Sequence, residues 1–141
     1  MSIVKSQGTK ITVSADGTTF KTVGHVKSFS GVGGGSATVI DTTHLLSVAK
    51  EKALGLQDFG EVSLELNYVP ADGGQVILKT AQENQSEIDV KIELPDGTTS
   101  GTTWAFKAYV STFPKGGGVD DIVTGSVTMP ISGAVTETAA V

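Results

Sequence analysis

Two stretches of this 141-residue chain alternate strictly between apolar and polar side chains, one from Gly60 to Val69 and one from Ile88 to Leu94. In the first stretch the apolar positions are Val62, Leu64, Leu66 and Tyr68, and the polar positions are Glu61, Ser63, Glu65 and Asn67. Successive side chains of a β-strand point to opposite faces of a sheet. Each stretch therefore predicts a strand with one buried face and one solvated face.

Turn-forming residues separate further extended segments. Asp16-Gly17 lies between Ile11–Val13 and Thr18–Phe20 and predicts an opening hairpin. Pro95-Asp96-Gly97 predicts a turn after the second alternating stretch. Other strands are expected at Val23–Phe29, Ser36–Thr42, Thr103–Phe113 and Ile122–Ile131, and the run Gly31–Gly35 is expected to be a flexible link.

One segment has the signals of a helix. Pro70 stops the first alternating strand, Asp72 can act as an N-cap, and Gln75 can reach back to it before the apolar run from Val76 to Ala81. This predicts a helix over 73–84. Combined with the strands, it predicts a single domain over residues 1–141, all-β with one flanking α-helix, as a small sandwich or barrel.

Residues 41–59 do not fit a strand period, although they contain many apolar side chains. They hold Leu45, Leu46, Val48, Leu54 and Leu56. One interpretation is a segment that caps the core, with a short helix that starts near Ser47 and ends at Gly55. The other is a long loop whose apolar side chains become buried against another copy of the chain.

Few residues are available for catalysis or for a bound group. The chain has no cysteine, its ten basic residues are all lysine, and its two histidines are His25 and His44. Asp41 and His44 have no third metal ligand nearby, and the carboxylates of the alternating strands lie on strand faces, so we expect no enzyme activity, metal or cofactor. The apolar runs are shorter than the ~18 residues of a membrane span, so no membrane partner is expected.

The order of several short motifs resembles that of a known family. Val39–Thr43, Ala49–Glu51 and Gly55–Glu61 are similar to the long-loop region of the major tail tube proteins of long-tailed, siphophage-type bacteriophages. Downstream, Phe106–Ser111 and Gly118–Asp121, before a strand that ends at Ile131–Gly133, continue the same order. The resemblance extends from about Gly8 to Thr136.

The resemblance implies a structural virion protein that is assembled in the host cytoplasm into stacked hexameric rings of the tail tube. Its partners would be further copies of itself, a tape-measure protein, and tail terminator and tip proteins. Phage DNA would pass through the tube without specific binding. The glycine-rich link and both polar termini are candidates for ordering when subunits dock. No additional immunoglobulin-like domain is expected, because the tube domain accounts for the whole chain.

The resemblance also implies roles for particular residues. The inter-ring loop would contain Asp41, Leu45, Leu46, Val48, Lys50, Glu51, Leu54, Leu56, Asp58 and Phe59, and the channel wall would contain Glu61, Ser63, Glu65 and Asn67. Residues 61–141 hold four Lys and eleven acidic residues, a net charge of −7 that favours a wall repelling DNA. The alternatives are a monomeric β-sandwich binding module, such as an adhesin or baseplate-type domain, and a small hydrolase.

Overall fold

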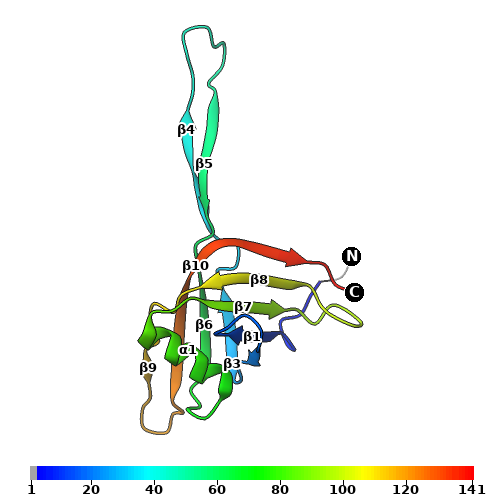
Figure 1. The fold of residues 1–141 in the computed structure, drawn as a ribbon, viewed down its shortest axis with the longest axis vertical. Coiled ribbons are helices and arrows are strands. Elements are labelled where there is room, and N and C mark those ends of the chain that lie inside the picture. The colour runs from blue at the N-terminus through cyan, green and yellow to red at the C-terminus, as the bar shows by residue number, and fades with distance from the viewer. Residues whose placement is uncertain (1–2) are drawn as a thin grey trace.

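The computed structural model describes residues 3–141, which form a curled sheet, one helix and a hairpin that projects from the body (Figure 1). The elements are β1 (Lys10–Ser14), β2 (Lys21–Thr22), β3 (Val26–Ser30), β4 (Ser36–Asp41), β5 (Lys52–Asp58), β6 (Glu61–Asn67), α1 (Gly73–Asn84), β7 (Ile88–Glu93), β8 (Thr103–Ala108), β9 (Lys115–Gly116) and β10 (Thr124–Thr138). This confirms an all-β fold with one flanking helix.

The long strand β10 joins the two halves of the curled sheet. The strand order is β2-β1-β7-β8-β10-β6-β3, with β9 also paired to β10 and β4–β5 forming a separate hairpin. Residues 124–130 of β10 pair with β6, whereas residues 131–138 pair with β8. Gly133 has a positive φ of 86° where the register shifts, so the strand can bend from one half of the sheet to the other.

The core lies between the two halves of the sheet. Its fully buried members come from the inward positions of β1, β6, β7 and β10 and from the helix, and they include Val13, Val62, Leu64, Leu66, Leu78, Ile88, Val90, Ile92, Val127 and Met129. The two alternating stretches thus form β6 and β7 with the predicted faces buried. Packing of these side chains against one another supplies the main stabilisation of the fold.

The helix α1 spans Gly73–Asn84, the predicted range, and packs against β1 and β2. Asp72 is its N-cap, and the carboxylate Oδ2 accepts hydrogen bonds from the backbone N–H groups of Gln75 and Gly24, both at 3.1 Å. The predicted hydrogen bond from the Gln75 side chain back to the N-cap residue Asp72 is not formed. Gln75 is buried and bonds the backbone of Gly24, Asn67 and Val69 instead, because the N–H of Asp72 is already paired with the Val69 carbonyl.

The opening hairpin is present, but its second strand starts later than predicted. β1 pairs with Lys21–Thr22, and residues 15–20 form the connection. Asp16 holds that connection, because its Oδ1 accepts hydrogen bonds from Ser14 Oγ at 2.8 Å and from the N–H groups of Thr18 and Thr19 at 3.0 Å. Hydrogen bonds from Thr19, Thr18 and Ser14 hold the pKa of Asp16 well below its ordinary value.

Several other strand boundaries differ from the expected ones, including the starts of β3 at Val26 rather than Val23 and of β10 at Thr124 rather than Ile122. β8 ends at Ala108, and the chain continues beside β10, where Thr112 forms a bridge with Thr128. β10 continues beyond Ile131 to Thr138, although most side chains after Ile131 are exposed on both faces. Among residues 132–138 only Val135 packs, partly buried, against the core. With so little burial this part of the strand has no period-two pattern.

The two ends of the glycine run, Gly31 and Gly35, are closely packed, whereas a Cβ at Gly33 would meet nothing within 4 Å. The prediction of a flexible link therefore does not hold at these two positions. A Cβ on Gly31 would collide with the Glu61 carbonyl oxygen, and a Cβ on Gly35 would collide with the Asp58 carbonyl oxygen. Val32 packs against the core. The glycines are therefore required where two backbone segments approach closely. Among residues 3–141, no helix has the length and hydropathy needed to cross a membrane.

Candidate functional site

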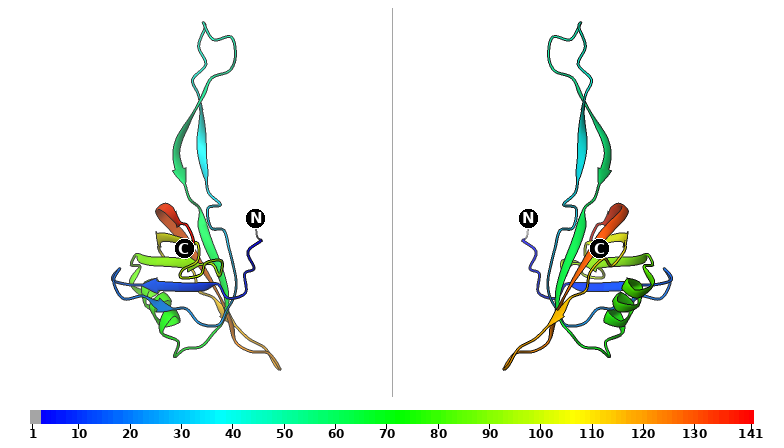
Figure 2. Two further views of the ribbon diagram at one scale, coloured as in Figure 1. Left: turned by 90° about the vertical axis from the view of Figure 1, so that its right-hand side faces the viewer. Right: turned by 90° about the vertical axis from the view of Figure 1, so that its left-hand side faces the viewer.

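The most prominent surface feature is the arm, defined here as residues 36–58, which comprise β4, its turn and β5. The two strands pair from Ser36 with Asp58 to Asp41 with Lys52. Figures 1 and 2 show that they project away from the rest of the molecule. The predicted short helix near Ser47 is absent, and the interpretation that this segment caps the core is wrong.

The arm presents its apolar side chains to solvent. Leu45 and Val48 are fully exposed, Leu46 is 88% exposed, and Leu56 is 97% exposed. Because both faces of the hairpin are solvated, the sequence contains no alternation, which explains why β5 was missed. Leu54 and Asp58 also lie in β5, Lys50 lies in the turn, and Phe59 is half-buried just beyond the base of the arm. Several exposed apolar side chains on one projecting element are typical of an interaction site.

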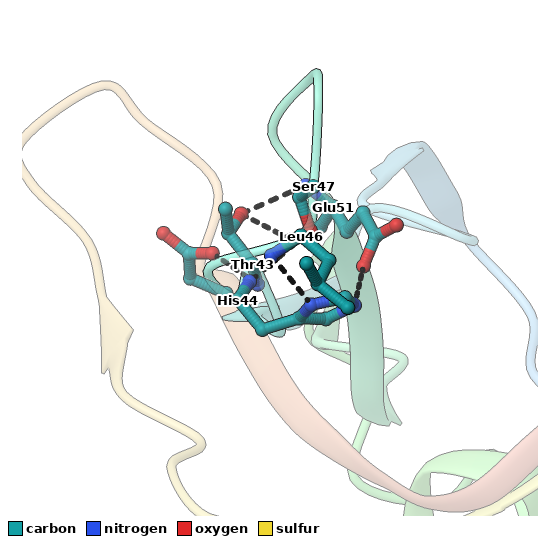
Figure 3. Close-up of polar contacts among 6 residues, drawn as sticks. Thr43, His44, Leu46, Ser47 and Glu51 are labelled. Atoms are coloured by element: carbon teal, nitrogen blue, oxygen red, sulfur yellow. Dashed lines mark hydrogen bonds and ion pairs between the residues drawn. The ribbon is translucent and has the colours of Figure 1, made fainter.

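Polar contacts give the arm tip a defined shape (Figure 3). Thr43 links the two sides of the turn, because its Oγ1 accepts a hydrogen bond from the Glu51 N–H at 2.8 Å and donates one to the Glu51 carbonyl at 3.3 Å. His44 Nε2 lies 3.4 Å from Glu51 Oε2, the only ion-pair contact within residues 3–141. Hydrogen bonds from the Thr43 hydroxyl and N–H hold the pKa of Asp41 below its ordinary value. The tip is therefore a structured turn.

A second candidate surface is the polar face of β6. Glu61 and Glu65 are exposed, and Ser63 and Asn67 are half-buried. Their cross-strand neighbours on β10 are Pro130, Thr128, Ser126 and Thr124, and those on β3 include Ser28 and Ser30. Glu65 also borders an open hollow of about 410 Å³ whose lining includes Lys27 and Lys115. This face is therefore rich in hydroxyl groups and has few charges.

Asn67 differs from the other three residues predicted for the channel wall. Its Oδ1 atom is buried and has no hydrogen-bond partner among residues 3–141. Its backbone is held from two sides, because its N–H donates to the His25 carbonyl at 2.8 Å and its carbonyl accepts from Gln75 Nε2 at 3.0 Å. Asn67 thus lies at the end of the polar face, where the strand meets the helix.

The two histidines do not form a common site. His44 is at the arm tip, whereas His25 precedes β3 with a left-handed φ of 63°, outside the strand in which it was expected. Across residues 3–141, no group of three or more His, Asp or Glu side chains is arranged to hold a metal ion. The sequence analysis placed Ile122 and Val123 in a strand, but they lie before β10, and together with Val119 they are exposed between β9 and β10. The sequence feature that could have indicated this exposed surface is the group of apolar residues that follows the glycine run Gly116–Gly118.

Comparison with protein families decides which family this architecture belongs to. The family model described as phage tail tube, TTP, lambda-like, matches residues 1–141. The chain belongs to the lambda-like phage tail tube family. It is therefore a structural protein of the virion, built into the tail tube. No curated protein matches the sequence.

Several solved structures share the fold at low sequence identity. A chain of the SPP1 tail tube matches with a TM-score of 0.74 and 12% identity, covering 99% of this chain and 81% of that one. A chain of the tail of an empty gene transfer agent particle matches with a TM-score of 0.74 and 17% identity, covering 97% and 100%. A chain of the sheath–tube complex of the extracellular contractile injection system PVC matches with a TM-score of 0.74 and 18% identity, covering 98% and 93%.

Proposed function

We propose that this chain assembles into six-fold rings that stack head to tail into the tail tube, with the arm of each subunit reaching the neighbouring ring. The observation that carries the proposal is the exposed apolar arm tip formed by Leu45, Leu46 and Val48. Each leucine that becomes buried contributes about 1.5–3 kcal/mol to association.

Free strand edges supply the contacts within a ring. In the half of the sheet that contains β10 and β6, β3 and β9 are the outer strands of the described chain. Unpaired strand edges favour pairing with another chain, and joining the edge of β3 to the edge of β9 in the next subunit closes a barrel. The gene transfer agent tail, whose fold is similar, has C6 symmetry, and we propose the same number of subunits here.

The polar face of β6 then lines the channel. We propose that Glu61, Ser63 and Glu65 face the DNA, together with the hydroxyl groups of Ser126 and Thr128 on β10, and that Asn67 lies at the end of this wall. A wall with few cations releases few counterions from DNA and therefore binds it weakly. The tape-measure protein would occupy the same channel during assembly.

The ends of the tube need different partners, because head-to-tail stacking leaves one unmatched surface at each end. We propose a terminator protein at one end and a tip protein at the other. Chains from a PVC sheath/tube terminator structure and from the tube-terminating cap of the anti-feeding prophage have similar folds, with TM-scores of 0.74 and 0.71. A terminator of related fold could therefore use the same contacts as a tube subunit.

The arm can be tested by changing its chemistry without changing its length. Replacing Leu45, Leu46 and Val48 with Ser should leave the monomer folded and raise the concentration required for tube formation by more than about tenfold. Sedimentation and negative-stain electron microscopy measure the tubes, and circular dichroism measures folding. The control replaces the same residues with Met, Met and Ile and should form tubes normally. Normal tubes from the serine variant would disprove the arm's role.

We also infer that the chain has no catalytic function. The two histidines lie far apart in the fold, one at the arm tip and one beside β3. His25→Gln with His44→Gln should leave a phage infectious, apart from a small effect of the lost His44–Glu51 contact, since exposed ion pairs contribute about 0–1 kcal/mol. Plaque counts and tail images provide the measurement. A large loss of infectivity by particles with normal tails would indicate a chemical role.

A further inference from the structure

A second exposed apolar surface lies at the opposite end of the molecule from the arm. The end loop, defined here as residues 117–123, connects β9 to β10 (Figure 1). In this loop Val119 is 93% exposed, Ile122 is 63% exposed and Val123 is 49% exposed. Exposed apolar side chains that are grouped in one loop are typical of a surface that becomes buried against a partner.

The arm and the end loop are extensions of the same pair of strands. β6 and β10 are antiparallel, with Glu61 opposite Pro130 and Asn67 opposite Thr124. The arm precedes β6 at the Glu61 end, and the end loop precedes β10 at the Thr124 end. Both features therefore belong to the half of the sheet for which we propose ring closure. The arm and the end loop project from opposite ends of the body (Figure 2). Stacking a second copy along the line from the end loop to the arm tip would therefore bring the arm tip of one subunit toward the end loop of the next.

The arm carries two lysines and the end loop two aspartates, although Asp41 and Glu51 give residues 41–52 of the arm a net charge of zero. Lys50 and Lys52 flank Glu51 on the arm, and Glu51 is contacted by His44. The end loop carries Asp120 and Asp121. All four of these lysine and aspartate side chains are exposed, and within residues 3–141 none forms an ion pair.

The backbone of the end loop is a defined turn. The N–H of Asp121 donates a hydrogen bond to the Gly118 carbonyl at 3.2 Å, and Asp120 has a left-handed φ of 64°. A left-handed conformation is tolerated by Asp more readily than by larger or branched residues. The turn therefore defines the backbone from which Asp120 and Asp121 project, next in sequence to the exposed Val119 and Ile122.

We propose that the end loop is the receptor for the arm tip of a second copy of this chain. The apolar side chains of the tip bury against Val119, Ile122 and Val123, and Lys50 and Lys52 lie opposite Asp120 and Asp121. This inference rests on the proposed head-to-tail stacking and names the surface that receives the arm. Ionic contacts at the rim of an apolar interface act mainly on association rate and register, so they select the correct stacking.

A charge exchange tests the pairing. Lys50→Glu with Lys52→Glu, and separately Asp120→Lys with Asp121→Lys, should each raise the critical concentration for tubes by about tenfold or more, most strongly at low salt. Combining the four changes in one chain restores opposite charges and should restore tubes. Glu83→Lys with Glu87→Lys, a matched reversal around the end of α1, should leave assembly unchanged.

Cysteine cross-linking provides a second measurement that does not depend on the charges. The chain has no cysteine, so Leu46→Cys with Ile122→Cys introduces the only thiols. Oxidised tubes of this variant should give a ladder of covalent multimers on a non-reducing gel. Leu46→Cys with Val76→Cys, which places the second thiol on α1, should give no ladder.

The outcomes separate this inference from the proposed function. If the serine arm variant fails to form tubes but the charge exchange does not restore them and no ladder forms, the arm acts in stacking and docks on another surface, so the inference is wrong. If the serine variant forms normal tubes, the proposed role of the arm in stacking is wrong, and the inference that rests on it is wrong as well. Restored tubes together with a ladder support the pairing of the arm with the end loop.

Discussion

Individual residues were predicted best where the core alone determines their environment. The inward residues of β6 and β7 are buried as expected, because a strand with one buried face must place apolar side chains at every second position. Gln75 lies in the first turn of the helix as predicted, but its side chain does not bond the predicted partner, the N-cap residue Asp72. A capping rule considers neighbours within one turn, whereas the side chain of Gln75 bonds Gly24, which is distant in sequence. Such a contact exists only once the helix is docked on the sheet.

The buried Gln75 gives a prediction about stability. Gln75→Leu should lower the free energy of unfolding by roughly 2–5 kcal/mol, because it removes the partners of the Gly24 and Asn67 carbonyls and of the Val69 N–H. Urea denaturation of the monomer measures the change. Gln82→Leu, a substitution of the same type on the same helix, is the control and should change stability by less than about 0.5 kcal/mol. Equal stability of the two variants would mean that these bonds contribute little.

At the scale of elements, the sequence predicts most of those that contribute to the core, and also β4 of the arm, but it misses β5 and the second half of β10. The helix and the strands β6 and β7 were predicted because burial imposes a period on each. The arm and the second half of β10 have no such period, since both of their faces are solvated in the single chain. The glycine run at the base of the arm was misread for a related reason. Composition cannot distinguish a glycine that allows motion from one that allows close packing, as at Gly35.

The close contact at Gly35 predicts that the direction of the arm is sensitive to one methyl group. Gly35→Ala would make a Cβ collide with the Asp58 carbonyl oxygen, so the base of the arm must open. We expect a loss of roughly 1–3 kcal/mol in stability and a marked loss of tubes. Hydrogen exchange of the β4 and β5 amides and electron microscopy are the measurements.

Gly55 provides the control on the same arm. A Cβ added there meets its nearest atom at 3.5 Å, an ordinary van der Waals contact. Gly55→Ala should therefore form tubes as the unmodified chain does. If Gly35→Ala also forms normal tubes and retains protected arm amides, the arm base tolerates rearrangement and its glycines do not set the arm's direction.

At the scale of the whole molecule, several surfaces have no partner within one subunit, and this is the feature that the proposed assembly explains. The chain buries one ordinary core, yet it exposes an apolar arm, an apolar end loop and two strand edges. The family resemblance predicted the assembly, whereas the residue pattern alone left a binding module and a hydrolase as alternatives. The net charge of the second half also proved a poor guide to its proposed wall. Most of the acidic residues lie on β7, in loops or near the ends of α1, and the polar face of β6 contributes only Glu61 and Glu65.

The last prediction concerns the charge of the proposed channel wall. Glu61→Lys with Glu65→Lys exchanges two carboxylates for two ammonium groups in every subunit, and stacked rings repeat the change along the tube. Lys27 and Lys115 border the same hollow as Glu65, so the wall becomes strongly cationic. Phosphate contacts that strengthen at low salt should then slow DNA ejection, whereas tubes should still form because Val62, Leu64 and Leu66 remain buried in the core.

The matched control for this experiment removes charge without reversing it. Glu61→Gln with Glu65→Gln should eject DNA at nearly the normal rate, since uncharged amides release no counterions from DNA. Ejection rates of both variants are measured against salt concentration, using phages whose tails are intact in electron micrographs. Ejection that is slow for the lysine variant at low salt and recovers at high salt supports a DNA-facing wall. Ejection at the normal rate at every salt concentration would mean that Glu61 and Glu65 point away from the channel, and the absence of tails would mean that they hold neighbouring subunits together.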